Sequence, residues 1–459
     1  MNHLAGYFNF AGRVWDKRVP VLPELIMLVL WTTSAAHSPQ VSLWDFVPSQ
    51  ELNNRLPNWL SFSGEFRARA EAVTGIGFRD GSDDDYLLSR LRINMTVKAA
   101  DWLKFQFGGQ DDRAVWNRRI PAAPPYEQTM NLRIAYLELG DTEKKTFGLR
   151  VGREEILLGD QRLVGNSNWL DVPRVFDVVR LTLRHKGYRL DAFAANPVQP
   201  VNGEFDRPFR QKADNFYGMY GGFEKIVPHA VVEPYVFWRV TRNLLTEFSR
   251  PGNRDSKTLG VRWVGTLPSN FDYQLETALQ RGSLGSDRIA AWAGHWLLDH
   301  SLAAARKARV FVEYNFSSGD RNPRDGVEGT FDQLYPTGHD RYGLADQVGW
   351  RNIEDARAGA ELHPRKGWLV AVSYHSYWLA SATDALYGAN GMPIVRQADG
   401  SAGRRIGQEG DVSVLYNLNR QIQLGVGFAH LFPGQFLRST TSARPQLPIL
   451  DGDLWFLVI

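Results

Sequence analysis

The sequence predicts an all-β protein: a transmembrane antiparallel β-barrel of about eighteen strands, with short periplasmic turns and long extracellular loops. Two observations carry this prediction. Segments of about ten residues alternate apolar with polar side chains, as a strand does when its two faces meet different environments. The segments are joined by turns that are alternately very short and very long, as in bacterial outer-membrane barrels.

The N-terminal residues 1–36 have the features of a secretory signal peptide. Lys17 and Arg18 precede a short apolar core at 25–31, and small residues at 34–36 offer a cleavage site. The charged pair comes late in this segment, so a later translation start and a retained signal anchor remain alternatives.

The next segment, 37–59, contains Pro and Asn without a clear period. We expect it to form a periplasmic lead into the barrel, which occupies residues 60–459. Barrels of this kind usually end on an aromatic residue, whereas this chain ends on Ile459. We therefore expect the C-terminal signal for the barrel assembly machinery to be weak, or to be recognised differently.

The alternation is clearest in the first predicted strand. One face carries Phe62, Gly64, Phe66, Ala68, Ala70 and Ala72, and the other carries Ser63, Glu65, Arg67, Arg69 and Glu71. Residues 90–98 repeat the pattern, and so do residues 309–316, where Phe311 interrupts the polar face. A soluble sandwich also alternates, but its polar face rarely carries so many arginines opposite aromatic residues.

Turn lengths set the number of strands. Short links are predicted at 99–101, 140–144, 186–187, 225–229, 268–270, 301–305, 364–367 and 417–420. Long stretches are predicted at 74–83, 111–127, 157–173, 198–211, 242–255, 281–287, 318–350, 380–407 and 433–448. The segments between them number about eighteen, an even count that leaves both ends of the barrel on the periplasmic side.

Composition fits a barrel better than a helical membrane protein. After the N-terminal region no run approaches the ~20 apolar residues that a spanning helix needs, and the mean hydropathy is −0.33. The chain has 15 Trp and 16 Tyr, which suits aromatic girdles at the membrane interfaces. Candidates for those girdles are Trp59, Trp102, Trp238, Trp368, Trp378 and Trp455. There is no cysteine, so neither disulfides nor thiolate chemistry contribute.

The inward faces predicted from the alternation collect arginines. The candidate lining of the substrate pathway is Arg67, Arg69, Arg90, Arg92, Arg133, Arg150, Arg180, Arg184, Arg189, Arg309 and Arg357. Supporting acids on the same faces are Glu65, Asp191, Glu313 and Glu361, and further basic residues are Lys98, Lys104, Arg239 and Arg262. A guanidinium stays charged and forks onto carboxylates or phosphates, so this lining predicts an anion pathway.

The alternative is that these arginines pair with acids and brace the wall of a wide barrel. The formal net charge is only +3, so any selectivity for anions has to be local.

Three stretches resemble the alginate export family of outer-membrane barrels. They are VGREE (151–155) with GDQRLVG (159–165), Asn168-Trp169, Arg174 and Phe176-Asp177; GDRNP (319–323) with GTFDQLYPTGH (329–339) and GWRN (349–352); and HLFPGQF (430–436). The resemblance implies an eighteen-stranded monomeric barrel whose arginine-rich constriction passes the polyuronate alginate out of the cell. It also implies that long loops and a periplasmic turn act as gates.

The predicted function is an outer-membrane channel of a Gram-negative bacterium, most simply an exporter of an alginate-like polyuronate. An anion-selective porin for uptake of organic acids and a plugged structural barrel remain alternatives. The long loop 318–350 either folds into the lumen, covers the mouth, or is an extracellular flap without a gating role. Expected partners are outer-membrane lipids and lipopolysaccharide, anionic polysaccharides or small anions, and periplasmic export proteins, but not nucleic acid.

An enzyme is not predicted. The chain has no G-x-S-x-G and no H-E-x-x-H, and Ser373 with His375 share a face as any lumen-facing strand would show. No cofactor is predicted and no defined metal site. The acidic run Asp80, Asp83, Asp84 and Asp85 is a candidate only for attracting Ca²⁺ at an extracellular loop.

Overall fold

The computed structural model describes residues 48–79, 81–204, 206, 214–245, 251–302, 308–440 and 452–458. The predicted signal peptide lies outside these residues, so its cleavage stays a prediction. Within the predicted lead, residues Pro48–Arg55 form helix α3. The side chain of Asn53 in α3 both accepts and donates a 2.8 Å hydrogen bond with the backbone of Phe62, which ties the helix to the first strand.

The predicted fold class is confirmed, because the described residues form one antiparallel ring of eighteen strands. The strands are β1 (Leu60–Val73), β2 (Asp84–Ala100), β3 (Leu103–Val115), β4 (Gln128–Gly140), β5 (Phe147–Glu154), β6 (Phe176–His185), β7 (Tyr188–Pro197), β8 (Asp214–Phe223), β9 (Ala230–Leu245), β10 (Pro251–Leu267), β11 (Phe271–Leu284), β12 (Asp287–Ser301), β13 (Arg309–Ser317), β15 (Ile353–Leu362), β16 (Trp368–Leu379), β19 (Arg405–Asn417), β20 (Gln423–Pro433) and β21 (Gly452–Val458).

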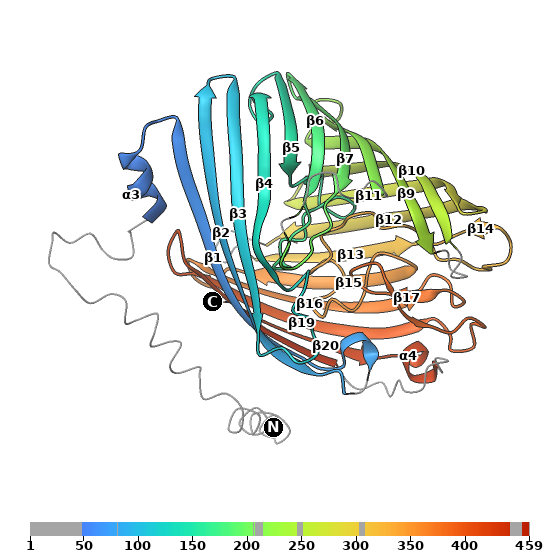
Figure 1. Cartoon of the computed structure of the whole chain (residues 1–459). Helices are drawn as coiled ribbons and strands as arrows, with labels where there is room; N and C mark the ends of the chain where they lie inside the picture. The colour runs from blue at the N-terminus through green and yellow to red at the C-terminus, as the bar shows by residue number, and fades with distance from the viewer. Residues whose placement is uncertain are drawn as a thin grey trace, which may run out of the picture. The chain divides into compact units, whose positions relative to one another are not determined.

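Each strand of the ring pairs with the next one along the chain, and β21 pairs with both β20 and β1. The strands therefore close into a barrel, whose wall can be followed in Figure 1 from blue β1 to red β20. Short elements decorate the ring: η1 (Ile76–Phe78), β14 (Val327–Glu328), the hairpin of β17 (Ala385–Tyr387) with β18 (Pro393–Arg396), and α4 (Gln435–Ser439). No helix in the described part of the chain is long and apolar enough to cross a membrane.

Two predicted long loops are wrong. At 242–255, β9 continues to Leu245 and β10 begins at Pro251, and the two strands stay paired up to these residues. The stretch 281–287 is rich in Gly and Ser, but β11 continues to Leu284 and β12 begins at Asp287, so only a tight turn remains. Gly282 and Ser283 stay paired with Ser256 and Asp255 of β10. Turn-forming residues do not end a strand when a neighbouring strand supplies hydrogen-bond partners for it.

Two long loops fold into the barrel and pair with each other. They are residues 155–175 between β5 and β6, called here the first inner loop, and residues 318–352 between β13 and β15, the second inner loop. Val164 and Tyr335 form a parallel bridge between them, and the N–H of Gly165 donates to the carbonyl of Tyr335 at 2.8 Å. Of the locations considered for loop 318–350, the lumen is the one that the structure has.

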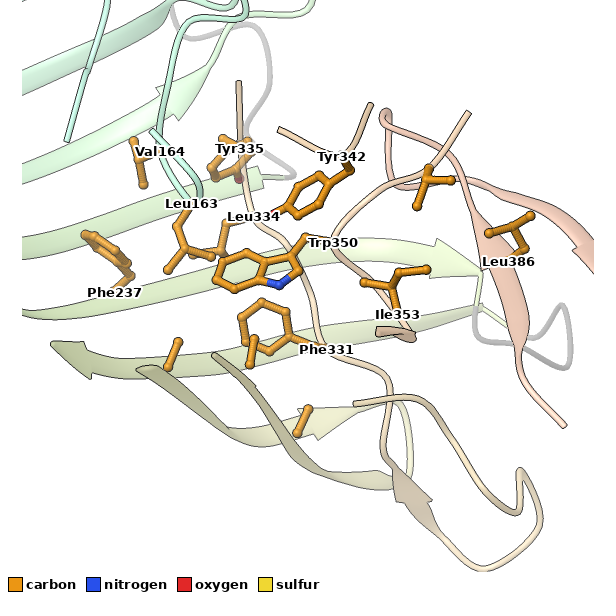
Figure 2. Packing of buried hydrophobic residues seen from close by; sticks show 14 of the residues in the cluster. Leu163, Val164, Phe237, Phe331, Leu334, Tyr335, Tyr342, Trp350, Ile353 and Leu386 are labelled. Atoms are coloured by element: carbon orange, nitrogen blue, oxygen red, sulfur yellow. The ribbon is translucent and has the colours of Figure 1, made fainter. Parts of the chain in front are cut away.

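The second inner loop carries the centre of an interior hydrophobic core. Figure 2 shows Trp350 between Phe331 and Tyr342, with ring centroids 5.6 Å and 6.1 Å away. Tyr335 of the same loop packs against the rings of Phe216 and Phe176 on the wall, at 4.9 Å and 5.4 Å. Burying these rings holds the loops inside the barrel. The alternating pattern of the strands gives no sign of this core.

The wall that meets this core is aromatic and leaves no room for a side chain at Gly218 of β8. Gly218 is in register with Phe193 of β7 and Phe237 of β9. A Cβ at Gly218 would lie 2.3 Å from Cζ of Phe193 and 2.9 Å from Cδ1 of Phe237. Because the flanking rings already occupy this space, overpacking is the expected result of any larger residue.

We expect Gly218→Val to lower the free energy of unfolding by about 1–3 kcal/mol, measured by urea denaturation of the barrel in lipid vesicles. Gly109→Val is the matched control, since Gly109 of β3 is exposed and a Cβ there would meet nothing within 4 Å. Equal stability of the two variants would contradict the packed arrangement of this wall.

The outer face of the barrel is apolar and exposed. Phe66 of β1, Leu259 of β10 and Val312 of β13 are 68%, 63% and 58% exposed. Each alternates along its strand with residues that face inward. A water-soluble domain rarely leaves so much apolar surface uncovered, so this belt is suited to a hydrocarbon environment. The girdle candidates Trp59, Trp102, Trp238 and Trp368 are also exposed, whereas the side chain of Trp455 lies outside the described residues.

Candidate functional site

The interior of the barrel places basic side chains directly opposite one another on adjacent strands. Four such pairs stand in register on β1–β7: Arg67 with Arg90, Lys98 with Lys104, Arg150 with Arg180, and Arg184 with Arg189. Like charges directly opposite each other destabilise a sheet. Each pair therefore needs either acids that neutralise it or a role that requires concentrated positive charge.

One group of arginines grips the first inner loop. Arg67 donates to the carbonyls of Asn168 and Trp169 at 3.1 Å and 2.8 Å and forms an ion pair with Asp171. Arg90 donates to the carbonyls of Asn168 and Leu170 at 2.8 Å and 3.1 Å. These contacts fix the loop segment 168–171 against β1 and β2.

Two further arginines complete this group. Arg92 donates to the side-chain oxygen of Asn168 at 2.7 Å, and the guanidinium of Arg69 lies 4.1 Å from the ring centroid of Trp169. Glu65 contacts Arg90 and Arg92, and Arg69 pairs with Glu71. We call Arg67, Arg69, Arg90 and Arg92 the loop-holding arginines. Arg69, Arg90 and Arg92 are 2%, 2% and 5% exposed, so a passing solute meets little of them.

A second group is buried within the wall. Arg133 pairs with Glu155 at 2.7 Å, and Arg150 and Arg180 share the carboxylate of Glu154 at 3.0 Å and 3.1 Å. Because Glu154 of β5 binds Arg180 of β6, this ion pair stabilises the contact between two strands of the wall.

A third group lies beside the short turns, which face the periplasm in the predicted topology. It consists of Lys98, Lys104, Arg184 and Arg189, and we call it the periplasmic basic group. The side chains of Lys104, Arg184 and Arg189 are 26%, 28% and 33% exposed, and Lys98 is also exposed. Their acidic partners are Glu138, Glu143 and Asp191. These cations are the most accessible among those that the alternation predicted on β1–β7.

The opposite wall has fewer accessible cations. Arg309 of β13 pairs with Asp299 at 2.9 Å and with Glu361 at 3.1 Å. Its guanidinium carbon lies 5.4 Å from the ring centroid of Phe311, the apolar residue in this polar face. Arg357 contacts Glu313 at 3.4 Å. Each of the eleven arginines proposed as lining thus has a carboxylate within 4.0 Å.

Three cations hold the inner loops to the far wall, and of these the sequence predicted only Arg239 on an inward face, without its partner. Arg162 of the first inner loop donates to Glu313 of β13 at 2.8 Å and lies 3.2 Å from Asp160. Arg239 and Arg254 reach Asp332 of the second inner loop at 3.0 Å and 3.4 Å. Burial by itself would raise the pKa of the Asp332 carboxyl, but Arg239 and Arg254 hold that pKa far below its usual range. The ionised form of Asp332 is therefore favoured.

The alternation predicted the inward face of Arg239 but not its partner Asp332, and the motif GDQRLVG, which contains Arg162, carried only the family resemblance. The strand pattern marks which face a residue takes, but it says nothing of residues in a loop.

The acidic run near the first extracellular loop has protein partners. Asp84 accepts three backbone N–H groups from residues 118–120, and a guanidinium of the same segment pairs with Asp85. Asp83 accepts a backbone N–H at 3.0 Å, and Asp80 lies outside the described residues. Among the described residues, no group of three or more His, Asp or Glu side chains could hold a metal ion.

Ser373 and His375 do not contact each other as a catalytic pair would. Ser373 donates to Asp411 at 2.9 Å, and Nδ1 of His375 lies 3.0 Å from Asp355. His375 is fully buried. The three strands β15, β16 and β19 are cross-linked by these contacts.

A closed barrel with an apolar outer belt, an interior lined with charges, and long loops at one end defines an outer-membrane channel. The chain belongs to the alginate export family, whose model, described as "Alginate export", matches residues 58–446. The resemblance seen in the sequence is confirmed, and the protein is placed in the outer membrane of a Gram-negative bacterium.

Solved structures share the fold at low sequence identity. OccK1 (OpdK) of Pseudomonas aeruginosa is 12% identical with a TM-score of 0.59, over 86% of this chain and 97% of that chain. OpdO of the same organism is 15% identical with a TM-score of 0.57, over 88% and 97% of the two chains. At these identities the likeness concerns the fold alone. None of the curated sequences compared with the chain matches it.

Proposed function

We propose that this outer-membrane channel passes anionic substrates, in the first place an alginate-like polyuronate on its way out of the cell. The observation that carries the proposal is the periplasmic basic group, in which Lys98 faces Lys104 and Arg184 faces Arg189 across neighbouring strands. These side chains are accessible, whereas the loop-holding arginines are buried under the first inner loop. A polymer leaving the periplasm would meet the accessible cations first.

The chemistry of this group suits a polyuronate. Guanidinium groups bind carboxylates through paired hydrogen bonds, and repeated cations let a polyanion pass from one site to the next. The nearby acids Glu138, Glu143 and Asp191 keep Lys104, Arg184 and Arg189 from binding a carboxylate too tightly. Conduction requires that balance, because a substrate has to leave as well as enter.

A second candidate function is that of a porin for small organic acids. The two inner loops and their core occupy part of the lumen, and this narrowing favours small anions over a polymer. A plugged barrel is the limiting case in which the inner loops never move.

The zero-current potential of the purified protein in a planar bilayer under a salt gradient tests these functions, measured without and with added polyuronate. Anion preference with block by the polymer would support polyuronate transport. Anion preference without block would favour the small-anion porin. Cation preference would overturn the anion channel, and a complete absence of conductance would favour the plugged barrel.

We expect Arg184→Gln/Arg189→Gln to reduce the anion preference and to weaken block by polyuronate about tenfold, because two accessible cations that face each other are lost. The same bilayer measurement checks this. The matched control is Arg365→Gln/Lys366→Gln, which removes two exposed cations from the turn between β15 and β16. An unchanged reversal potential in the first variant would mean that Arg184 and Arg189 only brace the wall.

A further inference from the structure

The outer surface carries a second concentration of cations, on β9–β12 at the end of the barrel from which the two inner loops arise. Arg242, Lys257, Arg281 and Arg288 are all exposed there. On their strands they alternate with the buried residues Thr241, Ser256, Gln280 and Ile289, which face the interior. The four cations therefore point away from the lumen. We call them the outer basic patch.

The patch is continuous across the sheet. Trp238 of β9 is in register with Lys257 of β10, and Lys257 is in register with Arg281 of β11. The side chains of residues so paired have Cβ atoms about 5 Å apart. Arg288 of β12 is opposite Ser283, which places it diagonally beside Arg281 on the same face.

The charge of the patch is only partly neutralised. Asp255 lies 3.4 Å from the ammonium of Lys257 and accepts a 2.9 Å hydrogen bond from the indole N–H of Trp238. For Arg281 and Arg288, no carboxylate of the described residues lies within 4 Å of the guanidinium. One guanidinium nitrogen of Arg281 donates to the carbonyls of Gln280 and Ala291 at 2.7 Å and 3.3 Å, which leaves its other N–H groups for a ligand. With Arg288 and Lys257 beside them, these donors suit a phosphate group.

An apolar groove begins where the patch ends. Its volume is about 540 Å³, and it runs over the outer face of β6–β9. The lining includes Val179, Leu181, Ala194, Tyr217, Met219, Val236 and Trp238, with Lys257 at its edge. The ring of Trp238 lies tilted beside that of Tyr217, with ring centroids 5.2 Å apart, and its indole N–H donates to Asp255 in the patch. The groove suits a hydrocarbon chain whose polar head lies at the level of the patch.

We propose that the outer basic patch and this groove bind lipid A, the phosphorylated and acylated anchor of lipopolysaccharide. The phosphate lies between Lys257, Arg281 and Arg288, and one acyl chain lies in the groove along Met219 and Val236. The long loops mark this end of the barrel as the extracellular one, so the patch faces the outer leaflet. A basic cluster at the edge of an apolar surface is the arrangement that recognises anionic lipid headgroups.

Native mass spectrometry of the purified protein tests the proposal, with lipid A, dephosphorylated lipid A and phosphatidylglycerol added separately. The expected order of retention is lipid A first, with phosphatidylglycerol and the dephosphorylated form much weaker. In Arg281→Gln/Arg288→Gln, binding of lipid A should be about tenfold weaker, since two charge-assisted contacts to phosphate are lost. The control Arg365→Gln/Lys366→Gln should bind it like the wild type.

A second variant probes the groove. Ala194→Trp places a large ring in the groove without changing a charge, and Ala194 is exposed on the outer face. It should weaken binding of lipid A while the bilayer conductance stays at the wild-type value, which shows that the barrel is folded and that the site is separate from the channel. Wild-type affinity in both variants would overturn the site, and equal retention of phosphatidylglycerol by the wild type would overturn its assignment to lipid A.

Discussion

Replacing Arg67 and Arg90 together with Gln is expected to release the first inner loop and raise the single-channel conductance. The two side chains donate five hydrogen bonds to the segment 168–171, including the ion pair of Arg67 with Asp171. Losing such charge-assisted bonds should cost about 3 kcal/mol or more, a factor above about 100 in the balance between docked and released loop. Planar-bilayer recording measures the conductance directly.

The control for this variant is Arg309→Gln. It also removes a cation from the lumen, but the partners of Arg309 are Asp299 and Glu361 on adjacent strands and not the first inner loop. Because the chain has no cysteine, Trp169→Cys can report on the loop through its rate of thiol labelling. A conductance and labelling rate equal to those of the parent would show that other contacts suffice to hold the loop.

Replacing Arg162 with Met is expected to give the largest loss of stability. Arg162 is buried and pairs with Glu313, which is 5% exposed, so its removal leaves a buried carboxylate with weaker partners. Breaking a buried pair in this way costs about 3–5 kcal/mol. Urea unfolding in lipid vesicles, followed by tryptophan fluorescence, measures the loss.

The double variant Arg162→Met/Glu313→Gln separates the charge effect from a packing effect. Removing both charges should restore much of the lost stability, because no unpaired carboxylate is left. Additive losses from the two single changes would indicate that Arg162 acts through its packing against Tyr342 and not through its charge.

The barrel itself could be predicted because a strand between lipid and water encodes its two faces in a period of two. Arg90 and Leu91, or Glu313 and Val312, take opposite faces as the alternation requires, and the short links place the strand ends correctly. The prediction failed at 281–287, where Gly and Ser resembled a loop but pairing with β10 continued the strand. It also failed at 242–255, where β9 and β10 extend toward each other and stay paired.

The partners of the arginines could not be predicted. Arg67 meets Asp171 from a position 104 residues away in the chain, in a loop without any periodic pattern. The interior core could not be predicted for the same reason, because Trp350 and Phe331 lie in a loop. The aromatic rings that pack against this core occupy inward positions, which the alternation predicts to face water. The face that a strand residue takes can be predicted from the local sequence. Contacts across the lumen depend on how the whole barrel closes.

The composition of the core around Trp350 also has a consequence for the sequence of folding steps. In a soluble domain, apolar side chains gather early and strands align around them. Here the residues of the core come from strands as distant as β6 and β20 together with both inner loops, so they meet only after the wall has curved round. We therefore expect the core to pack only once the wall has closed around both inner loops. Closure of the wall and packing of the inner loops should then appear as two kinetic phases of folding.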